Sequence, residues 1–382
     1  MKATAKGNHK TVYDRSHFCQ GRPKSPRGFS AGLFHHITYG MTDTPFRIAC
    51  VGAGFFAQLH HAAWREADGA DLIGIADPNR AATIPDGVPR FDRLDALLAA
   101  GPVDILDIAT PPHTHAELIE TAIANGVTRI ICQKPFCGTL EAARQVTKRA
   151  KASGVSLAVH ENFRFQPWYR HLHRIITERR LGTLYQFRFA LRPGDGQGPN
   201  AYLDRQPYFQ SMARFLVHET AVHFLDVFTF LFGRPTNIYA DLRRLNPAIA
   251  GEDAGLVICG YENGFRAVFD GNRLADHAAS NTRLTMGEAI LEGEKGSLRI
   301  DGFGRIAIRD HGSIDWQEVA PPPADNSFGG GCVAALCQQA VDAWRSGGTP
   351  EVMAADYLNV LRMEEAVYDS AGSGTRITLD AG

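Results

Sequence analysis

The sequence lacks the features by which membrane, secreted and nucleic-acid-binding proteins are usually recognised. Its 382 residues contain no run of about 18 apolar residues that could cross a bilayer, and the start of the chain has no apolar signal segment. The 41 acidic and 40 basic residues leave a net charge of −1, which provides no overall positive field for a polyanion. We therefore predict a cytoplasmic protein that binds neither nucleic acid nor a membrane.

Cysteine pairs are lacking as well. The seven cysteines are odd in number and scattered, and none of them forms a CxxC pair. This distribution favours reduced, mostly structural thiols over a disulfide framework or a zinc site. We predict no bound metal, and a zinc-dependent dehydrogenase is disfavoured because no set of cysteines and histidines has convincing ligand spacing.

The first forty residues have little acidic charge, since seven lysines and arginines stand against Asp14 alone. Gly, Pro and Ser interrupt any hydrophobic periodicity there. We predict that residues 1–45 form a basic, disordered extension and that translation begins at Met41. A transit peptide or an electrostatic anchor is the alternative for this segment.

Hydrophobic residues, by contrast, make up 44% of the chain and charged residues 21%, which permits a sizeable core. The length suggests two domains, or one large one. From residue 46, short apolar runs alternate with helical stretches, the pattern of βαβ units around a parallel sheet. Residues 46–162 are therefore predicted to form a doubly wound α/β domain. Its strands are expected at 47–51, 71–76, 103–109, 128–132 and 156–160, and its helices at 57–66, 94–100, 115–125 and 140–152.

Residues 163–382 have mainly the pattern of strands and are predicted to form an α+β domain with a largely antiparallel sheet. Tight connections at 262–264 and 294–296 are typical of antiparallel neighbours. Two late helices are expected to return to the first domain or to the boundary between the domains. The strands are expected at 184–191, 237–242, 255–261, 265–270, 283–291, 297–300 and 306–309, and the helices at 168–180, 331–345 and 354–370.

The first predicted strand is followed by the string Gly-Ala-Gly-Phe-Phe-Ala, a GxGxxA version of the dinucleotide fingerprint of Rossmann domains. Gly52 permits the tight turn, Gly54 lets the backbone approach a pyrophosphate, and the small Ala57 lets the helix pack on the strand. Backbone N–H groups at the helix start, around Phe55 and Phe56, would then face the phosphates. A purely structural glycine turn is the alternative.

Asp77 ends the next predicted strand, 25 residues after Gly52. A carboxylate there can accept hydrogen bonds from both ribose hydroxyls and would repel a 2′-phosphate, which favours NAD over NADP as the cofactor. Arg80 argues in the other direction, because it could stack on adenine or tolerate a phosphate.

Two more loops are expected at the same edge of the sheet, where ligands of doubly wound folds bind. The first carries Thr110 and His113, and a packing or helix-start role is the alternative for His113 and for His115. The second carries Gln133 and Lys134 before a proline. Lys134 would stand beside the nicotinamide, whose positive charge in the oxidised form should lower the pKa of the lysine. A solvated surface charge is the alternative for Lys134.

Glu219, His223 and Asp226 are spaced i, i+4 and i+7, so they share one face of a predicted helix. Glu219 and His223 could then address one substrate, with Lys134 across the cleft. Because the helix is rich in Phe and Leu, a histidine that only fills the core is the alternative.

In this order, GxGxxA, a strand-end Asp, Thr-Pro-Pro with a following His, and Gln-Lys-Pro resemble the motifs of the Gfo/Idh/MocA family, from about residue 46 to the C-terminus. The resemblance implies a Rossmann domain followed by an open, mostly antiparallel sheet that binds substrate and mediates homodimer or homotetramer formation. It also implies oxidation of a hydroxyl-bearing carbon of a sugar, cyclitol or related polyol.

The family's string D-x-G-x-H-x-x-D is similar to the segment that ends at Asp226. It implies that His223 is the catalytic histidine and that Glu219 contacts substrate. The chain departs from the family pattern at three positions, because Glu219 replaces Asp, Ala221 replaces Gly, and Gln133 replaces the commoner Glu before Lys134. These departures weaken any transfer of substrate identity.

The string His-Glu-Asn-Phe-Arg-Phe at 160–165 lies where the family carries a segment near cofactor and substrate. It implies that Asn162 holds the nicotinamide side and that Arg164 donates to sugar oxygens, with a salt bridge at the domain boundary as the alternative for Arg164. Together with residues 205–209, this string resembles the D-apiose dehydrogenase-like branch of the family. An aldose such as D-apiose, oxidised to a lactone, is therefore the favoured substrate.

The predicted reaction is reversible hydride transfer between NAD and a sugar-like substrate. His223 removes the hydroxyl proton as general base, since its reference pKa of ~6.5 lies near working pH. Lys134 holds the same oxygen and stabilises the charge that develops on it. One alternative is a non-catalytic NAD-linked sensor, which the retention of both residues disfavours. Another is an NAD-dependent glycosidase, in which the hydride leaves and returns.

Overall fold

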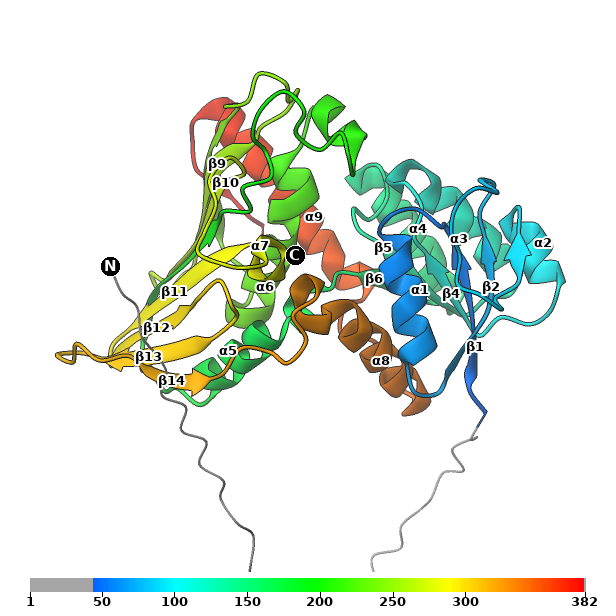
Figure 1. Cartoon of the computed structure of the whole chain (residues 1–382), viewed down its shortest axis with the longest axis horizontal. Helices are drawn as coiled ribbons and strands as arrows, with labels where there is room; N and C mark the ends of the chain where they lie inside the picture. Colours follow the sequence, from blue (N-terminus) through cyan, green and yellow to red (C-terminus); the bar gives the residue numbers. More distant parts are fainter. Residues whose placement is uncertain (1–43, 381–382) are drawn as a thin grey trace, which may run out of the picture. The chain divides into compact units, whose positions relative to one another are not determined.

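The computed structural model describes residues 44–380. Nearly all of the predicted basic extension, and the predicted start at Met41, lie outside these residues. The described chain contains a parallel sheet followed by a larger mixed sheet (Figure 1).

The first sheet has six strands in the order β3-β2-β1-β4-β5-β6, and all its strand pairs are parallel. This is the order of a doubly wound dinucleotide-binding fold, and it confirms the predicted Rossmann domain. The central strands β1 and β4 are largely buried, as expected where helices cover both faces of a parallel sheet. The elements are β1 Phe46–Val51, α1 Ala57–Glu66, β2 Ala70–Ala76, β3 Arg90–Phe91, α2 Leu94–Ala99, β4 Ile105–Ile108, η1 Pro112–Thr114, α3 His115–Ala124, β5 Arg129–Gln133, α4 Leu140–Ala152 and β6 Ser156–His160.

The second sheet has nine strands in the order β14-β13-β12-β11-β7-β10-β9-β8-β15. Its strand pairs are antiparallel except for the parallel pair of β7 and β10, which confirms the prediction of a mostly antiparallel sheet. The strands are β7 Leu184–Leu191, β8 Asn237–Arg243, β9 Ala254–Gly260, β10 Arg266–Asn272, β11 Gly287–Gly293, β12 Gly296–Ile300, β13 Ile306–Asp310, β14 Gln317–Ala320 and β15 Ile377–Thr378.

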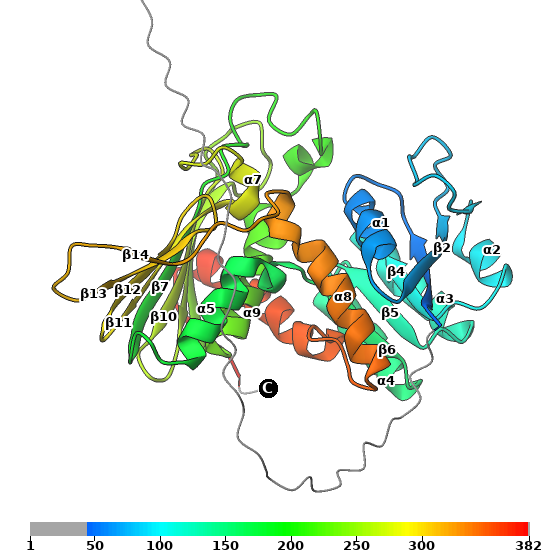
Figure 2. The ribbon, with the colours of Figure 1, turned by 60° about the horizontal axis from the view of Figure 1, so that its bottom comes forward.

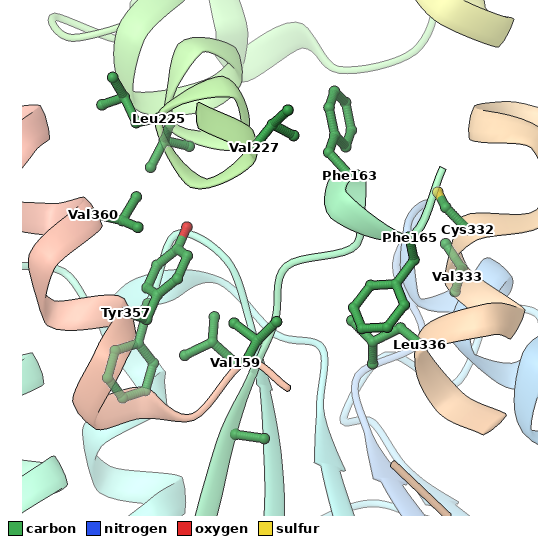
Figure 3. Packing of buried hydrophobic residues seen from close by; sticks show 14 of the residues in the cluster. Val159, Phe163, Phe165, Leu225, Val227, Cys332, Val333, Leu336, Tyr357 and Val360 are labelled. Carbon is green, nitrogen blue, oxygen red and sulfur yellow. The ribbon is translucent and has the colours of Figure 1, made fainter. Parts of the chain in front are cut away.

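The helices after β6 connect the two sheets. Helix α8 packs against α1, while α9 packs against α4, α6 and β8, so the two late helices do return to the first domain as expected (Figure 2). Helices α9 and α8 lie on opposite sides of the end of β6, where Phe163, Cys332 and Tyr357 belong to one buried cluster (Figure 3). The remaining elements are η2 Phe163–Phe165, α5 Pro167–Thr177, η3 Pro207–Ser211, a π-helical turn η4 Leu216–Ala221, α6 Val222–Phe232, α7 Thr282–Thr285, η5 Phe328–Gly331, α8 Cys332–Arg345 and α9 Ala354–Ser373.

One predicted strand was wrong at its beginning. Residues 283–285 belong to the short helix α7, and Met286 has a φ of +60°, so β11 starts only at Gly287. Gly287 itself has a φ of +156°, and a Cβ there would lie 2.0 Å from the carbonyl oxygen of Ala190. The alternation of apolar residues continues through this turn, so the predicted strand began too early. The turn ends at Gly287, where β11 lies close to β7.

Candidate active site

The glycine-rich loop after β1 has the backbone expected of a phosphate cradle. Gly52 has a φ of +106°, and a Cβ there would lie 2.4 Å from the carbonyl oxygen of Ala109 in the loop after β4. A Cβ on Gly54 would meet open space. Within residues 44–380, the N–H groups of Gly54, Phe55 and Phe56 have no acceptor, and they lead into α1. Free N–H groups at a helix start attract anions, so this loop fits a dinucleotide pyrophosphate.

Asp77 lies beside this loop at the end of β2. Its Oδ2 accepts a hydrogen bond from the N–H of Ala53 at 2.6 Å, and its Oδ1 accepts one from Asn79 at 2.7 Å. Arg80 points elsewhere, because its guanidinium donates to both carboxylate oxygens of exposed Asp92. The carboxylate is therefore fixed next to the cradle, while the nearby cation is already paired.

The loop after β4 is held together by its own side chains. The hydroxyls of Thr110 and Thr114 are 2.7 Å apart, and His113 is exposed. His115 is buried, with its Nε2 2.8 Å from the carbonyl oxygen of Thr110 and its Nδ1 3.4 Å from the N–H of Cys137. Burial lowers the pKa of His115 to about 4, so this ring is a neutral link between two loops.

Lys134 directly follows β5 and reaches across to the π-helical turn before α6. Its Nζ donates to the carbonyl oxygen of Glu219 at 2.7 Å and lies 3.1 Å from Oε1 of the same residue. Only 7% of the Lys134 side chain is exposed. Gln133 folds back, and its Oε1 accepts from the N–H of Lys134 at 2.8 Å. Glu219 thus fixes the ammonium group at the sheet edge where the cradle also lies.

His223 lies in the first turn of α6 and forms the most enclosed polar contact of the site. Its Nδ1 is 2.6 Å from Oε1 of Glu161, a residue with no exposed surface directly after β6. Glu161 also accepts from the N–H of Phe163 at 3.2 Å and from the hydroxyl of Tyr357 at 3.1 Å. The Phe163 ring stacks on the imidazole, with centroids 3.8 Å apart and planes 3° from parallel.

These contacts define the protonation states of the pair. Burial lowers the pKa of His223, and nearby Lys134 lowers it further, although negatively charged Glu161 opposes both effects. Burial acts to raise the pKa of Glu161, but His223, the Phe163 N–H group and Lys134 together bring it below its ordinary value. At neutral pH the site therefore holds a carboxylate and a neutral imidazole. Since Nδ1 carries the proton and donates it in a hydrogen bond to Glu161, the lone pair of Nε2 is free to accept a proton.

Two residues that the family resemblance placed near substrate or cofactor have other partners. Arg164 donates from Nε and Nη2 to the two carboxylate oxygens of Asp226, at 2.8 and 2.5 Å, so its salt bridge lies within the predicted second domain and does not cross the domain boundary. Burial raises the pKa of Asp226 to about 6 despite this arginine. The Nδ2 of Asn162 donates to Sγ of Cys332 at 3.3 Å, and Asn162 is 1% exposed.

The structure thus brings together Lys134, Glu219 and His223, but their supporting residues were not predicted. Glu161 stood in a string that the sequence analysis singled out, yet no role was assigned to it. Tyr357 comes from α9, 196 residues away from Glu161. A carboxylate next to Asn162 was the only local signal, and no sequence pattern pointed to Tyr357.

Comparisons with known proteins identify the family of the chain. Residues 46–161 match the family model described as "Oxidoreductase family, NAD-binding Rossmann fold", and residues 169–299 match the "GFO/IDH/MocA C-terminal domain". The chain is 34% identical to a D-apiose dehydrogenase of Paraburkholderia graminis, over 87% of this chain and 90% of the relative. It is 29% identical to a D-apiose dehydrogenase of Rhizobium rhizogenes, over 89% of this chain and 99% of the relative.

Solved structures resemble the chain over nearly its whole described length. An oxidoreductase of Agrobacterium radiobacter, crystallised with NAD⁺, L-tartaric acid and magnesium, has a TM-score of 0.78 and 27% identity, covering 88% of this chain and 98% of its own. A levoglucosan dehydrogenase in complex with NADH and levoglucosan has a TM-score of 0.73 and 20% identity, covering 88% and 99%. In residues 44–380, no helix has the length and apolar character of a membrane span.

Proposed function

The chain belongs to the Gfo/Idh/MocA family of NAD-binding oxidoreductases, and we propose that it oxidises a hydroxyl-bearing carbon of a sugar with NAD as the hydride acceptor. The observation that carries this proposal is the pairing of two hydrogen-bonded groups at one sheet edge. Lys134 is held by Glu219, and His223 is held by Glu161. A module that only binds NAD needs neither group.

His223 acts as the general base in the proposed mechanism. Its Nε2 accepts the proton of the substrate hydroxyl, and the positive charge that forms on the ring is stabilised by Glu161. The Nζ of Lys134 donates to the same substrate oxygen and stabilises the negative charge that develops as the proton leaves. A bound NAD would supply the hydride acceptor, so that the alcohol, having lost a proton to His223 and a hydride from its carbon, would become a carbonyl.

The cofactor would be held by residues at the carboxyl ends of five strands of the first sheet, β1, β2, β4, β5 and β6. We propose the glycine-rich loop for the pyrophosphate, and Asp77 for the adenosine ribose. Asp77 would disfavour a 2′-phosphate, and Arg80 is paired with Asp92, which supports a preference for NAD over NADP. The full proposed set is Gly52, Gly54, Phe55, Phe56, Asp77, Thr110, His113, Gln133, Lys134 and Asn162.

For the substrate, the names of the two relatives make D-apiose, oxidised to a lactone, the first sugar to test. Glu219, Lys134 and His223 form the proposed substrate-binding set. Arg164 is left out of this set because Asp226 occupies its guanidinium. Assembly into a homodimer or homotetramer stays a prediction from the family resemblance.

The proposal is tested by following NADH formation by the protein beginning at Met41, with NAD or NADP, over aldoses including D-apiose, inositols and polyols. We expect at least one sugar to reduce NAD to NADH. The same sugar should reduce NADP much more slowly. Binding of NAD without reduction on any substrate would contradict the proposal and favour a sensor. Release of an aglycone from glycosides without net NADH would favour a glycosidase.

A further inference from the structure

A group of arginines lies beside the proposed active site and contains more positive than negative charge. Arg205 and Arg273 both donate to Oδ2 of Asp195, at 3.1 and 3.0 Å. Arg273 is 2% exposed and also donates to the hydroxyls of Tyr202 and Thr220 at 2.8 and 2.6 Å. Arg273 is therefore saturated and acts as a fixed support, whereas Arg205 shares the one carboxylate with it.

Arg283 has no such partner. Its guanidinium carbon lies 5.8 Å from the ring centroid of Phe55 in the glycine-rich loop and 5.6 Å from that of Phe328. The side chain is half-buried, and its guanidinium has no hydrogen-bond acceptor among the residues that the structure describes. Burial lowers the pKa of Arg283, and the positive charges of Arg205 and Arg273 act in the same direction, while the charge of Asp195 opposes them.

The group therefore contains three guanidinium ions, and Asp195 is the only carboxylate in residues 44–380 that hydrogen-bonds to any of them. The Nε of Arg205 is also buried without a partner. Keeping partly desolvated charges unpaired costs free energy. Guanidinium groups are well suited to bind carboxylates and phosphates with two parallel hydrogen bonds. An excess of guanidinium groups over carboxylates among these described residues therefore points to a site for an anion.

Contacts connect the arginines to the catalytic residues from two sides. Thr220, which accepts from Arg273, directly follows Glu219, the partner of Lys134. Phe328, which lies under Arg283, is 6.1 Å from Phe163, and Phe163 stacks on His223. The cations thus border the same substrate region as the proposed base.

We propose that Arg205 and Arg283 form a subsite for an oxyanionic group, a carboxylate or a phosphate, on the sugar substrate. This inference rests on the proposed function in taking the ligand to be the substrate. The subsite would lead the protein to prefer sugar acids or sugar phosphates over neutral sugars of the same configuration. A neutral aldose such as D-apiose would fill the catalytic part of the site and leave the subsite to water.

The test measures the affinity of the NAD-loaded protein by calorimetry for two matched sets of sugars. D-Glucose, D-glucuronate and D-glucose 6-phosphate share a ring and differ at C6, and D-galactose and D-galacturonate repeat the neutral and acid pair. We expect at least one charged sugar to bind about tenfold or more tightly than its neutral partner, with an advantage that decreases at high salt. Stronger binding of the acid or of the phosphate identifies the type of oxyanion.

Variants of Arg283 test whether its guanidinium causes the preference for charged sugars. We expect Arg283→Met to abolish the advantage of the charged sugar, Arg283→Lys to keep part of it, and Arg266→Met to change nothing. Arg266 is exposed on β10, so its replacement removes the same charge elsewhere. The affinity for NAD alone should stay within about twofold in all three variants.

Equal affinity for charged and neutral sugars, or no binding of the charged sugars, would overturn the inference. An Arg283→Met variant that loses NAD affinity but keeps the preference for charged sugars would also overturn it, because the guanidinium would then serve a cofactor phosphate. Preferential binding of a charged sugar without any NADH formation would support the subsite while contradicting the proposed oxidation.

Discussion

Two histidines that lie only five residues apart on the segment from η4 to α6 each contact a glutamate. The distance from Nδ1 to Oε1 is the same in both pairs. His218 is 2.6 Å from Glu364, and His223 is 2.6 Å from Glu161. In the first pair the histidine side chain is 25% exposed, and in the second it is 6% exposed. The pKa of His218 is raised, whereas the pKa of His223 is lowered.

The difference arises from what surrounds each ring. Burial acts to lower both pKa values. The positive charge of Lys134 also acts to lower both. In His218 the hydrogen bond and charge of Glu364 outweigh these two effects, whereas in His223 they outweigh the effect of Glu161. The comparison shows that a short contact to a carboxylate does not decide the protonation state of a histidine. Only His223 is kept neutral by its surroundings, as a general base must be.

The largest expected effect comes from removing the buried histidine. Positioned proton transfer contributes roughly 10² to 10⁴ in rate, so His223→Ala should lower kcat by that factor while NAD affinity is kept. His218→Ala should change kcat less than about threefold, because His218 has no part in the proposed proton transfer. Steady-state NADH formation measures both variants. A His218→Ala variant as slow as His223→Ala would remove the distinction between the pairs.

Replacing Glu161 should lower kcat more than replacing Glu364, but by less than the loss of His223. Glu161→Gln keeps the shape but removes the charge that stabilises protonated His223, and we expect kcat to fall about 10- to 100-fold. Glu364→Gln is the matched control, since it makes the same change in the other pair. Circular dichroism and NAD titration show whether either variant is folded. Equal kcat values for the two folded variants would contradict a special role for Glu161.

Tyr357 should have a weaker influence through Glu161. Tyr357→Phe removes one hydrogen bond to Oε2, worth about 0.5 to 1.5 kcal/mol, and kcat should fall by a few-fold. Tyr169→Phe is the control, because the buried hydroxyl of Tyr169 has no hydrogen-bond partner in the described chain. Measuring kcat for both variants tests this prediction. A larger loss of kcat in Tyr169→Phe would contradict a role of Tyr357 in supporting Glu161.

The His218–Glu364 pair should affect the stability of the fold rather than catalysis. Because the folded pKa of His218 is raised above its unfolded value of ~6.5, its pairing stabilises the fold fully below that pH and loses its effect as pH rises through the folded pKa. The wild type should therefore exceed His218→Gln in free energy of unfolding by up to about 1 kcal/mol more at pH 5.5 than at pH 8.5. Urea unfolding at both pH values checks this, and a pH-independent difference would contradict it.

Local pattern was enough to predict much of this molecule. The sequence predicted α1, α4, β6 and β7 with the bounds that the structure has, because their periodicity and end signals agree. The turn at Gly52 could be predicted because its positive φ favours glycine. The strands β3, β14 and β15 were not predicted, since two to four residues carry too little periodicity.

Long-range pairing explains what the sequence could not show in the site. The contact of Glu161 with His223 spans 62 residues, and nothing near either residue identifies the other as its partner. The same holds for Arg164, where the sequence allowed both a substrate contact and a salt bridge. Only the folded chain shows that Asp226 occupies its guanidinium.

The pH dependence of kcat/KM for NAD reduction, compared between wild type and Glu161→Gln, tests the central claim most directly. The base works when deprotonated, so activity should rise with pH through an apparent pKa below about 6.5 in the wild type. Without the charge of Glu161, this rise should move to lower pH, and Glu364→Gln should leave it in place. A profile that is the same in wild type and Glu161→Gln, or one that moves only in Glu364→Gln, would contradict the assignment of His223 as the base.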